Sequence, residues 1–252
     1  MIEIIFLSLI QGVTEFIPVS SSSHLFLISE FVDFKQKSLT IDVSLHIGSF
    51  LAVLTYFYKD IANLIENKKL LIKIFISSLP IILVGFVLIQ TNLIENFRNL
   101  KVIGWTTLIF GVLLFLSDRF DIRKTLSSDF DFKAVLIIGF FQVLSLVPGV
   151  SRSGITITAA RFLKFKRLDA AKISFLISIP TLCVVSLYGL KNIIISEDLN
   201  FSIINIISLI FSFLFSLMTI KYFLKYIQKF SLDLFVVYRV ALGFALLVIS
   251  YL

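Results

Sequence analysis

The chain has 252 residues, of which 58% are hydrophobic and 15% are charged, and its mean hydropathy is +1.02. Soluble domains carry about 45–50% apolar and about 25% charged residues, so the composition excludes an ordinary soluble domain, and it is too apolar for a disordered chain. We expect an all-α integral membrane protein that forms one domain over residues 1–252. The net charge is +7. The basic residues lie in short segments between apolar runs, where they orient a protein in a bilayer, so we expect no nucleic-acid partner.

Six apolar runs are long enough to cross a bilayer, which takes about 20 residues per helix. The expected spans are residues 39–58, 70–91, 102–117, 173–190, 203–222 and 234–252. The segments between them are short and polar, so none of them predicts a separate domain.

Two further apolar stretches, residues 4–29 and 134–160, each hold a single Asp, Glu, Lys or Arg residue and are interrupted midway. Pro18 precedes a run of serines in the first stretch, and Pro148 precedes a run of serines and glycines in the second. Proline ends a helix and serine caps the start of the next one. Each stretch therefore predicts two half-helices joined by a polar elbow at membrane depth, where irregular backbone must be buried in protein or line a wet cavity.

The order of elements repeats, because each half of the chain, about 1–120 and 130–252, has one broken stretch followed by three spans. Pro18 and Pro148 align at an offset of 130 positions. If the broken stretches are re-entrant hairpins, each half crosses the membrane three times, so the second half is inverted and the two elbows meet near the midplane. Sixteen of the 23 Lys and Arg residues then lie on one side of the membrane and five on the other. Because basic residues are more frequent in cytoplasmic connectors, the side with sixteen is expected to be cytoplasmic, and the first elbow is expected to face outward.

Glu15 is the first candidate functional residue, since a carboxylate in an apolar run costs about 2.5–3.5 kcal/mol to insert. A structural ion pair with Arg152 is the alternative interpretation. Gln11 lies one helical turn before Glu15 on the same helix face, and such a pair of oxygen donors can hold a divalent cation. Arg152 stands alone among serines and glycine, and its guanidinium fork suits phosphate oxygens. Arg239, near the start of the last span, is a further charge within the membrane, and snorkelling to the cytoplasmic interface is the alternative interpretation.

The serines at positions 20 to 23 follow the first elbow directly. They are expected to cap the second half-helix or to cradle a phosphate together with its free backbone N–H groups. His24 comes next, within a few residues of a hydroxyl group and a buried carboxylate. These side chains have the chemistry of a nucleophile, a base and an orienting group, although a lone histidine can also be a cap or a core residue.

Three segments together resemble the signatures of the bacterial undecaprenyl-diphosphatase family, the bacitracin-resistance type. They are residues 11–21 with His24, residues 148–156, and Tyr238-Arg239 with Gly243. The resemblance runs the length of the chain. It implies six spans plus two re-entrant helical hairpins in an inverted-topology repeat, and a membrane phosphatase that removes the terminal phosphate of undecaprenyl diphosphate, recycling the carrier lipid of peptidoglycan synthesis.

The same resemblance implies roles for individual residues. Glu15 and Gln11 would be associated with a divalent cation, Mg²⁺ or Ca²⁺, and Arg152 would clamp the phosphate. The nucleophile would be Ser21, His24 or a water molecule, with His24 otherwise acting as acid and base. The supporting phosphate ligands would be Ser20, Ser151, Ser153 and Thr156. Many relatives carry Glu at position 11, so this chain lacks one ligand charge.

Two functions are compatible with such a site. The favoured one is hydrolysis of a polyprenyl diphosphate lipid at the bacterial inner membrane, at a site that faces the periplasm or exterior. The alternative is a transporter or flippase of a polyprenyl phosphate lipid, because inverted repeats suit transport equally well. The candidate nucleophiles favour the enzyme, and the two buried charges argue against a purely structural scaffold. The lipid substrate and the bilayer are the expected partners, and a homodimer stays open.

Overall fold

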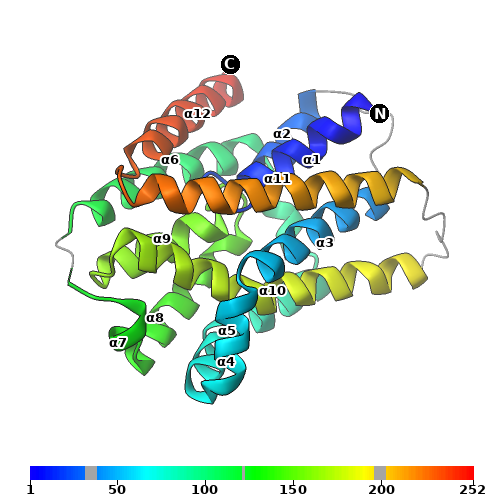
Figure 1. The fold of residues 1–252 in the computed structure, drawn as a ribbon. Coiled ribbons are helices and arrows are strands. Elements are labelled where there is room, and N and C mark those ends of the chain that lie inside the picture. Colours follow the sequence, from blue (N-terminus) through cyan, green and yellow to red (C-terminus); the bar gives the residue numbers. More distant parts are fainter. Residues whose placement is uncertain (32–38, 121–122, 196–202) are drawn as a thin grey trace.

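The computed structural model describes residues 1–31, 39–120, 123–195 and 203–252 (Figure 1). Within these residues the regular structure is helical, apart from one isolated bridge between Lys124 and Phe165. Six helices in this part of the chain are long and apolar enough to span a membrane, which confirms the six expected spans and makes the protein a multi-pass membrane protein. They are α3 (Leu39–Tyr56), α5 (Lys68–Gln90), α6 (Leu100–Asp118), α10 (Arg167–Ile195), α11 (Ile203–Ile227) and α12 (Asp233–Tyr251).

The surfaces of these helices are arranged as lipid requires. Along α11, Ser208, Ser212 and Ser216 are buried, whereas Ile210 and Leu214 are exposed. Small and polar residues therefore mediate helix contacts while apolar side chains face outward, which is typical of helix association in a bilayer. The contacts are close: a Cβ added at Gly12 would lie 2.7 Å from Phe215 Cβ.

Each broken stretch forms two short helices around an elbow. The first comprises α1 (Ile2–Thr14) and α2 (Ser21–Phe31), and the second comprises α8 (Phe132–Val143), the 3₁₀ turn η2 (Leu144–Leu146) and α9 (Arg152–Phe162). The longest of these helices has 13 residues, which at 1.5 Å per residue gives about 20 Å, too short for a hydrocarbon core of about 30 Å. The remaining helices lie in the connectors: α4 (Tyr58–Glu66), η1 (Leu93–Phe97) and α7 (Leu126–Asp129).

The two hairpins open toward opposite ends of the bundle (Figure 1). Ile4 of α1 and Ile28 of α2 both pack in a cluster with Ile41, which lies at the start of α3. Arg161, near the end of α9, donates from Nε to the Asp118 carboxylate at the end of α6, at 3.1 Å. Because α3, α5 and α6 are successive spans, the start of α3 and the end of α6 lie at opposite ends, so the hairpins are inverted relative to one another. Their depth in a bilayer stays a prediction.

Asp118 lies at the end of the bundle toward which the second hairpin opens. It joins the ends of α6 and α9 to the starts of α10 and α12. Its side chain is fully buried and accepts hydrogen bonds from Arg161, from Arg167 at the start of α10 (2.8 Å), and from the Leu232 backbone N–H before α12 (3.1 Å). Removing this buried carboxylate would leave the buried Arg161 and the partly buried Arg167 without their common anion. Asp118 therefore fixes where the second hairpin ends.

The structural register of the repeat differs by one residue from the offset of 130 that the prolines indicate. Ser20 (φ 79°) and Ser151 (φ 70°) both adopt positive φ immediately before a half-helix, and they are 131 positions apart. Only a few per cent of non-glycine residues do so, and both serines directly precede a half-helix after an elbow, which indicates that they are matching positions of the predicted repeat. At this register Gln11 matches Gln142 and Ser21 matches Arg152. The same backbone position thus carries a hydroxyl in one half and a guanidinium in the other.

Candidate active site

The two elbows are in direct contact. The Ser153 hydroxyl at the start of α9 donates to the backbone carbonyl of Ile17 in the first elbow, at 2.9 Å. α2 begins at Ser21 and α9 begins at Arg152, so both half-helices start at this contact. The first N–H groups of a helix lack intrahelical acceptors, and the helix dipole makes its N-terminal end positive. Two such ends at one place favour an anion.

Glu15 is the centre of a hydrogen-bond network that joins the two elbows. Arg152 Nη2 donates to Glu15 Oε1 at 2.7 Å, and Ser21 Oγ donates to Glu15 Oε2 at 2.7 Å. Gln11 Nε2 also lies 3.2 Å from Oε2. The carboxylate side chain is 8% exposed and the arginine side chain 12%. The structure therefore brings together four residues that the sequence singled out, from both halves of the chain.

Arg152 has one terminal nitrogen available for a ligand. Nη2 binds Glu15, whereas Nη1 is buried and has no hydrogen-bond partner among the described residues. A buried donor without an acceptor costs about 1–3 kcal/mol. A phosphate oxygen would satisfy it, so the unpaired nitrogen supports an anionic ligand at this point.

Gln11 supplies a second unpaired atom. Its Nε2 contacts both Glu15 and His46 Nδ1 in α3, the latter at 3.2 Å, while its Oε1 is buried without a partner among the described residues. A carbonyl oxygen next to a carboxylate fits a hard divalent cation, which prefers oxygen ligands. No group of three His, Cys, Asp or Glu side chains gathers anywhere in the described ranges, so such a cation would need phosphate oxygens and water as its other ligands. The metal stays a prediction.

The ring nitrogens of His24 bind other partners than Ser21, so the two side chains do not form the hydrogen-bonded pair that a serine–histidine mechanism requires. Its Nδ1 lies 2.6 Å from the Ser20 carbonyl oxygen, and its Nε2 lies within hydrogen-bond distance of the Tyr238 hydroxyl in α12. A carbonyl only accepts, so Nδ1 carries the proton, and Nε2 of the neutral ring accepts from tyrosine. The hydroxyl of Ser21 is bound instead by Glu15. The acceptor next to the candidate nucleophile is therefore the carboxylate.

The four supporting residues lie in different surroundings. Ser151 Oγ accepts from the Gly154 N–H at 3.1 Å, so it caps α9 as expected. Ser153 bridges the elbows, and Ser20 Oγ lies 3.0 Å from Ser23 Oγ. Thr156 is fully buried; its hydroxyl donates to Arg152 O in its own helix and lies 2.7 Å from Ser174 Oγ in α10. Its hydroxyl thus holds the hairpin against α10 rather than facing the Glu15 network.

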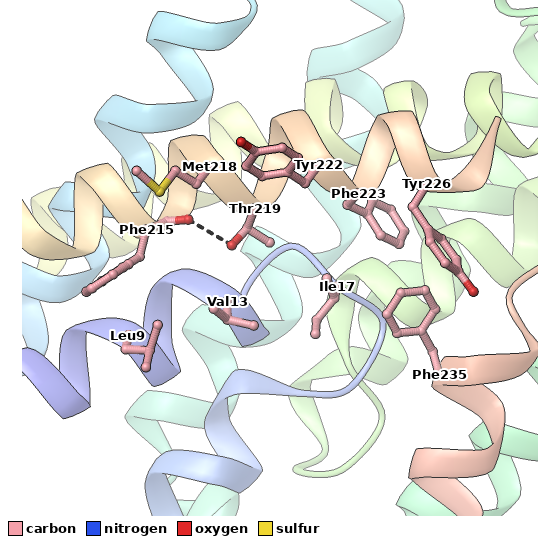
Figure 2. A pocket seen from close by; sticks show the side chains of 10 residues that line it. All are labelled: Leu9, Val13, Ile17, Phe215, Met218, Thr219, Tyr222, Phe223, Tyr226 and Phe235. Atoms are coloured by element: carbon pink, nitrogen blue, oxygen red, sulfur yellow. Dashed lines mark hydrogen bonds between the residues drawn. The ribbon is translucent and has the colours of Figure 1, made fainter. Parts of the chain in front are cut away.

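An apolar hollow of about 480 Å³ lies beside the first hairpin, between α1, the elbow, α11 and the start of α12 (Figure 2). Leu9 and Val13 line it on α1. At 3.6 residues per turn, Leu9 lies roughly 160° around the helix from Gln11. The hollow is therefore on the far face of α1 from the Glu15 network, and it is a separate feature of the surface.

Arg239 and His46 are the residues of this region that the sequence analysis did not assign to it. The alternative interpretation of Arg239, snorkelling to an interface, is wrong: the residue is fully buried and donates to the carbonyl oxygens of both elbows. Its charge inside an apolar span could have indicated that it belongs to the site. His46 lies in an ordinary span and carried no such signal. Tyr238 was noted only as part of the last motif.

The fold and the site define a polytopic membrane protein in which two inverted, broken-helix hairpins build a charge-paired centre suited to an anion. A family model described as "Bacitracin resistance protein BacA" matches residues 4–245. The chain belongs to this family, which confirms the resemblance seen in the motifs.

Curated relatives extend over nearly the whole chain, and the following three are named undecaprenyl-diphosphatase. A protein of Pelagibacter ubique (strain HTCC1062) is 50% identical over 99% of this chain and 98% of its own length. One from Saccharophagus degradans is 39% identical over 95% of this chain and 94% of its own, and one from Jannaschia sp. is 36% identical over 97% of both.

Proposed function

We propose that the chain is a membrane-embedded phosphatase that hydrolyses undecaprenyl diphosphate to undecaprenyl phosphate and inorganic phosphate, and so recycles the carrier lipid for peptidoglycan synthesis. The observation that carries the proposal is the Ser21 hydroxyl, which lies 2.7 Å from a carboxylate whose other oxygen is held by Arg152. The names of the relatives above support the same activity and give no support to a lipid carrier.

The terminal phosphate of the substrate binds where the two half-helices begin. The unpaired Nη1 of Arg152 donates to one phosphate oxygen. The first backbone N–H groups of α2 and α9, apart from the Gly154 N–H that Ser151 caps, donate to the others. Binding at this position places the phosphorus next to Ser21 Oγ. The positive helix ends and the guanidinium stabilise the charge that spreads over the phosphoryl oxygens as the transition state forms.

Ser21 attacks the terminal phosphorus while Glu15 accepts the hydroxyl proton. A bond forms between Oγ and phosphorus, the bond from phosphorus to the bridging oxygen breaks, and the departing lipid phosphate takes the proton from Glu15. A water molecule then attacks the phosphoserine with Glu15 again as the base, releasing inorganic phosphate and restoring the serine hydroxyl. Protonation of Glu15 also weakens its pairing with Arg152, which frees positive charge for the phosphate when it is needed.

A divalent cation, Mg²⁺ or Ca²⁺, is part of the proposal. Glu15 and the unpaired Oε1 of Gln11 would hold it, and it would neutralise the charge of the diphosphate. His24 keeps its predicted role as an acid, base or alternative nucleophile once Tyr238 releases its Nε2. All these side chains come from one chain, so the chemistry does not depend on a homodimer, which stays a prediction.

The expected location is the bacterial inner membrane, with the site open to the periplasm and the hairpins re-entrant. The charge bias of the connectors supports this orientation. It is also supported by the first hairpin, which opens toward the start of α3, away from the Asp118 cluster and its two arginines.

The test is phosphate release by purified protein from a C55 or C15 isoprenyl diphosphate in the presence of Mg²⁺ or Ca²⁺. We expect release by the wild-type chain and its loss in the Glu15→Ala variant. Unchanged release in that variant would remove Glu15 from the mechanism. Transport of the same lipid into vesicles is the control, and transport without phosphate release would favour the carrier instead.

A further inference from the structure

Arg239 makes contacts to both elbows from a helix that carries no other part of the Ser21–Glu15–Arg152 network. Its Nη1 donates to the carbonyl oxygens of Pro18 in the first elbow (3.2 Å) and Val150 in the second (3.0 Å). Its Nη2 donates to the carbonyl of Gly149 at 2.8 Å, and its Nε donates to that of Thr107 in α6 at 3.2 Å. One side chain thus joins three separate segments of backbone.

The guanidinium is held by carbonyl oxygens alone. Arg239 is 0% exposed, and no described carboxylate pairs with it. A buried charge is stable only when polar groups are aimed at it. The four carbonyls therefore have to keep their positions for Arg239 to remain charged there. In turn, the guanidinium fixes where those carbonyls, and the elbows that carry them, lie.

Space for this side chain is provided by glycines. A Cβ at Gly154 would lie 2.8 Å from Arg239 Nη1, and one at Gly111 would lie 3.0 Å from Arg239 Cβ. Gly149, whose carbonyl accepts from Arg239, has φ of +92°, a conformation that other residues rarely adopt. The second elbow and α6 are thus shaped around the guanidinium, which argues against an incidental contact.

The carbonyls bound by Arg239 lie next to the residues that the proposed chemistry uses. Pro18 is three positions from both Glu15 and Ser21, and Val150 is two positions before Arg152. We propose that Arg239 is a positioning residue that holds the two elbows in register, so that the Ser21 hydroxyl, the Glu15 carboxylate and the Arg152 guanidinium converge. This inference rests on the proposed function, because it assigns a task within that site.

Arg239 acts through the elbows and not on the substrate. Backbone carbonyls accept from four of its five N–H groups, and the side chain is fully buried, so its donors are directed at the backbone and not at a phosphate oxygen. Loss of the register should therefore misplace the nucleophile relative to the phosphorus, and a displacement of about 1 Å can cost about 100-fold in rate. The effect is expected in kcat, with KM nearly unchanged.

The test compares Arg239→Met and Arg239→Lys with Leu246→Ala, a buried apolar position seven residues further along α12. We measure the melting temperature, and kcat and KM for a C15 isoprenyl diphosphate. Arg239→Met is expected to lose about 100-fold in kcat with KM within about threefold. Arg239→Lys should lose less, since an ammonium keeps the charge but lacks the planar fork. Leu246→Ala should lower the melting temperature with little change in kcat.

Hydrogen–deuterium exchange gives a readout that does not depend on activity. Each variant is measured the same number of degrees below its own melting temperature. Peptides covering residues 15–20 and 147–151 should then both exchange faster in the Arg239 variants than in Leu246→Ala. The proposal is overturned if exchange at the elbows is unchanged, if Arg239→Lys matches the wild type in kcat, or if KM rises while kcat is kept. Absence of phosphate release by the wild-type protein would instead count against the proposed function, and the exchange result would still decide the register.

Discussion

Replacing Arg152 by lysine tests whether one guanidinium serves two partners at once. In the structure Nη2 is bound to Glu15 at 2.7 Å and Nη1 is buried and free for a phosphate oxygen. Lysine has one nitrogen, so Arg152→Lys can keep the contact with Glu15 or the contact with phosphate, but not both in the geometry of a fork.

The expected size of the effect follows from the lost contact. A hydrogen bond to a charged group contributes about 1.5–3 kcal/mol, and each 1.36 kcal/mol changes a rate about tenfold. If the contact is made in the transition state, kcat/KM for phosphate release should fall by about 10- to 150-fold. The fold should be kept, because the lysine can still pair with the Glu15 carboxylate.

The assay is initial-rate phosphate release from a C15 isoprenyl diphosphate, with Arg119→Lys as the matched control. Arg119 is half-exposed and pairs with Asp233 at 2.9 Å, and surface pairs of this kind contribute about 0–1 kcal/mol. The control should behave as the wild type. If Arg152→Lys kept kcat/KM within twofold of the control, the two-partner interpretation of Arg152 would be refuted.

Three further changes test other parts of the account. Asp118→Asn should destabilise the protein by about 3–5 kcal/mol, because it leaves two arginines without their buried anion; a melting curve in detergent that matches the wild type would contradict this. Gln11→Glu adds a carboxylate beside Glu15 and should lower the cation concentration for half-maximal activity by about tenfold; an unchanged titration would place the cation elsewhere. A cysteine at Asn96, in a Cys183→Ser background, should react with an impermeant thiol reagent from outside the cell, and labelling only after permeabilisation would invert the topology.

Hydropathy was sufficient to predict the six spans, because the bilayer imposes both their length and their composition. The elbows were also predictable, since Pro18 and Pro148 interrupt apolar stretches that are followed by serines. The pairing of Glu15 with Arg152 followed from the energetic cost of leaving either charge alone in lipid. These three inferences depend on forces that act on short segments or on single residues.

The remaining features depend on where distant segments meet, which local patterns do not encode. Arg239 lies near the start of its span, where snorkelling is possible for any long cation. Its actual partners are carbonyls of two elbows, and any residue type can supply a carbonyl. His24 lies close to Ser21 in sequence, yet the ring turns to Tyr238 in the last helix. His46 meets Gln11 only because α3 packs beside α1.

In the proposed mechanism, Glu15 and Ser21 act as one unit in removing the terminal phosphate. Its most direct test is a double-mutant cycle on phosphate release, with Glu15→Gln, Ser21→Ala and the double variant in the same detergent. Residues that act as a unit are strongly non-additive, so the double variant should be no slower than the slower single variant. Losses that multiply in the double variant would show that the two side chains act independently and would contradict the mechanism.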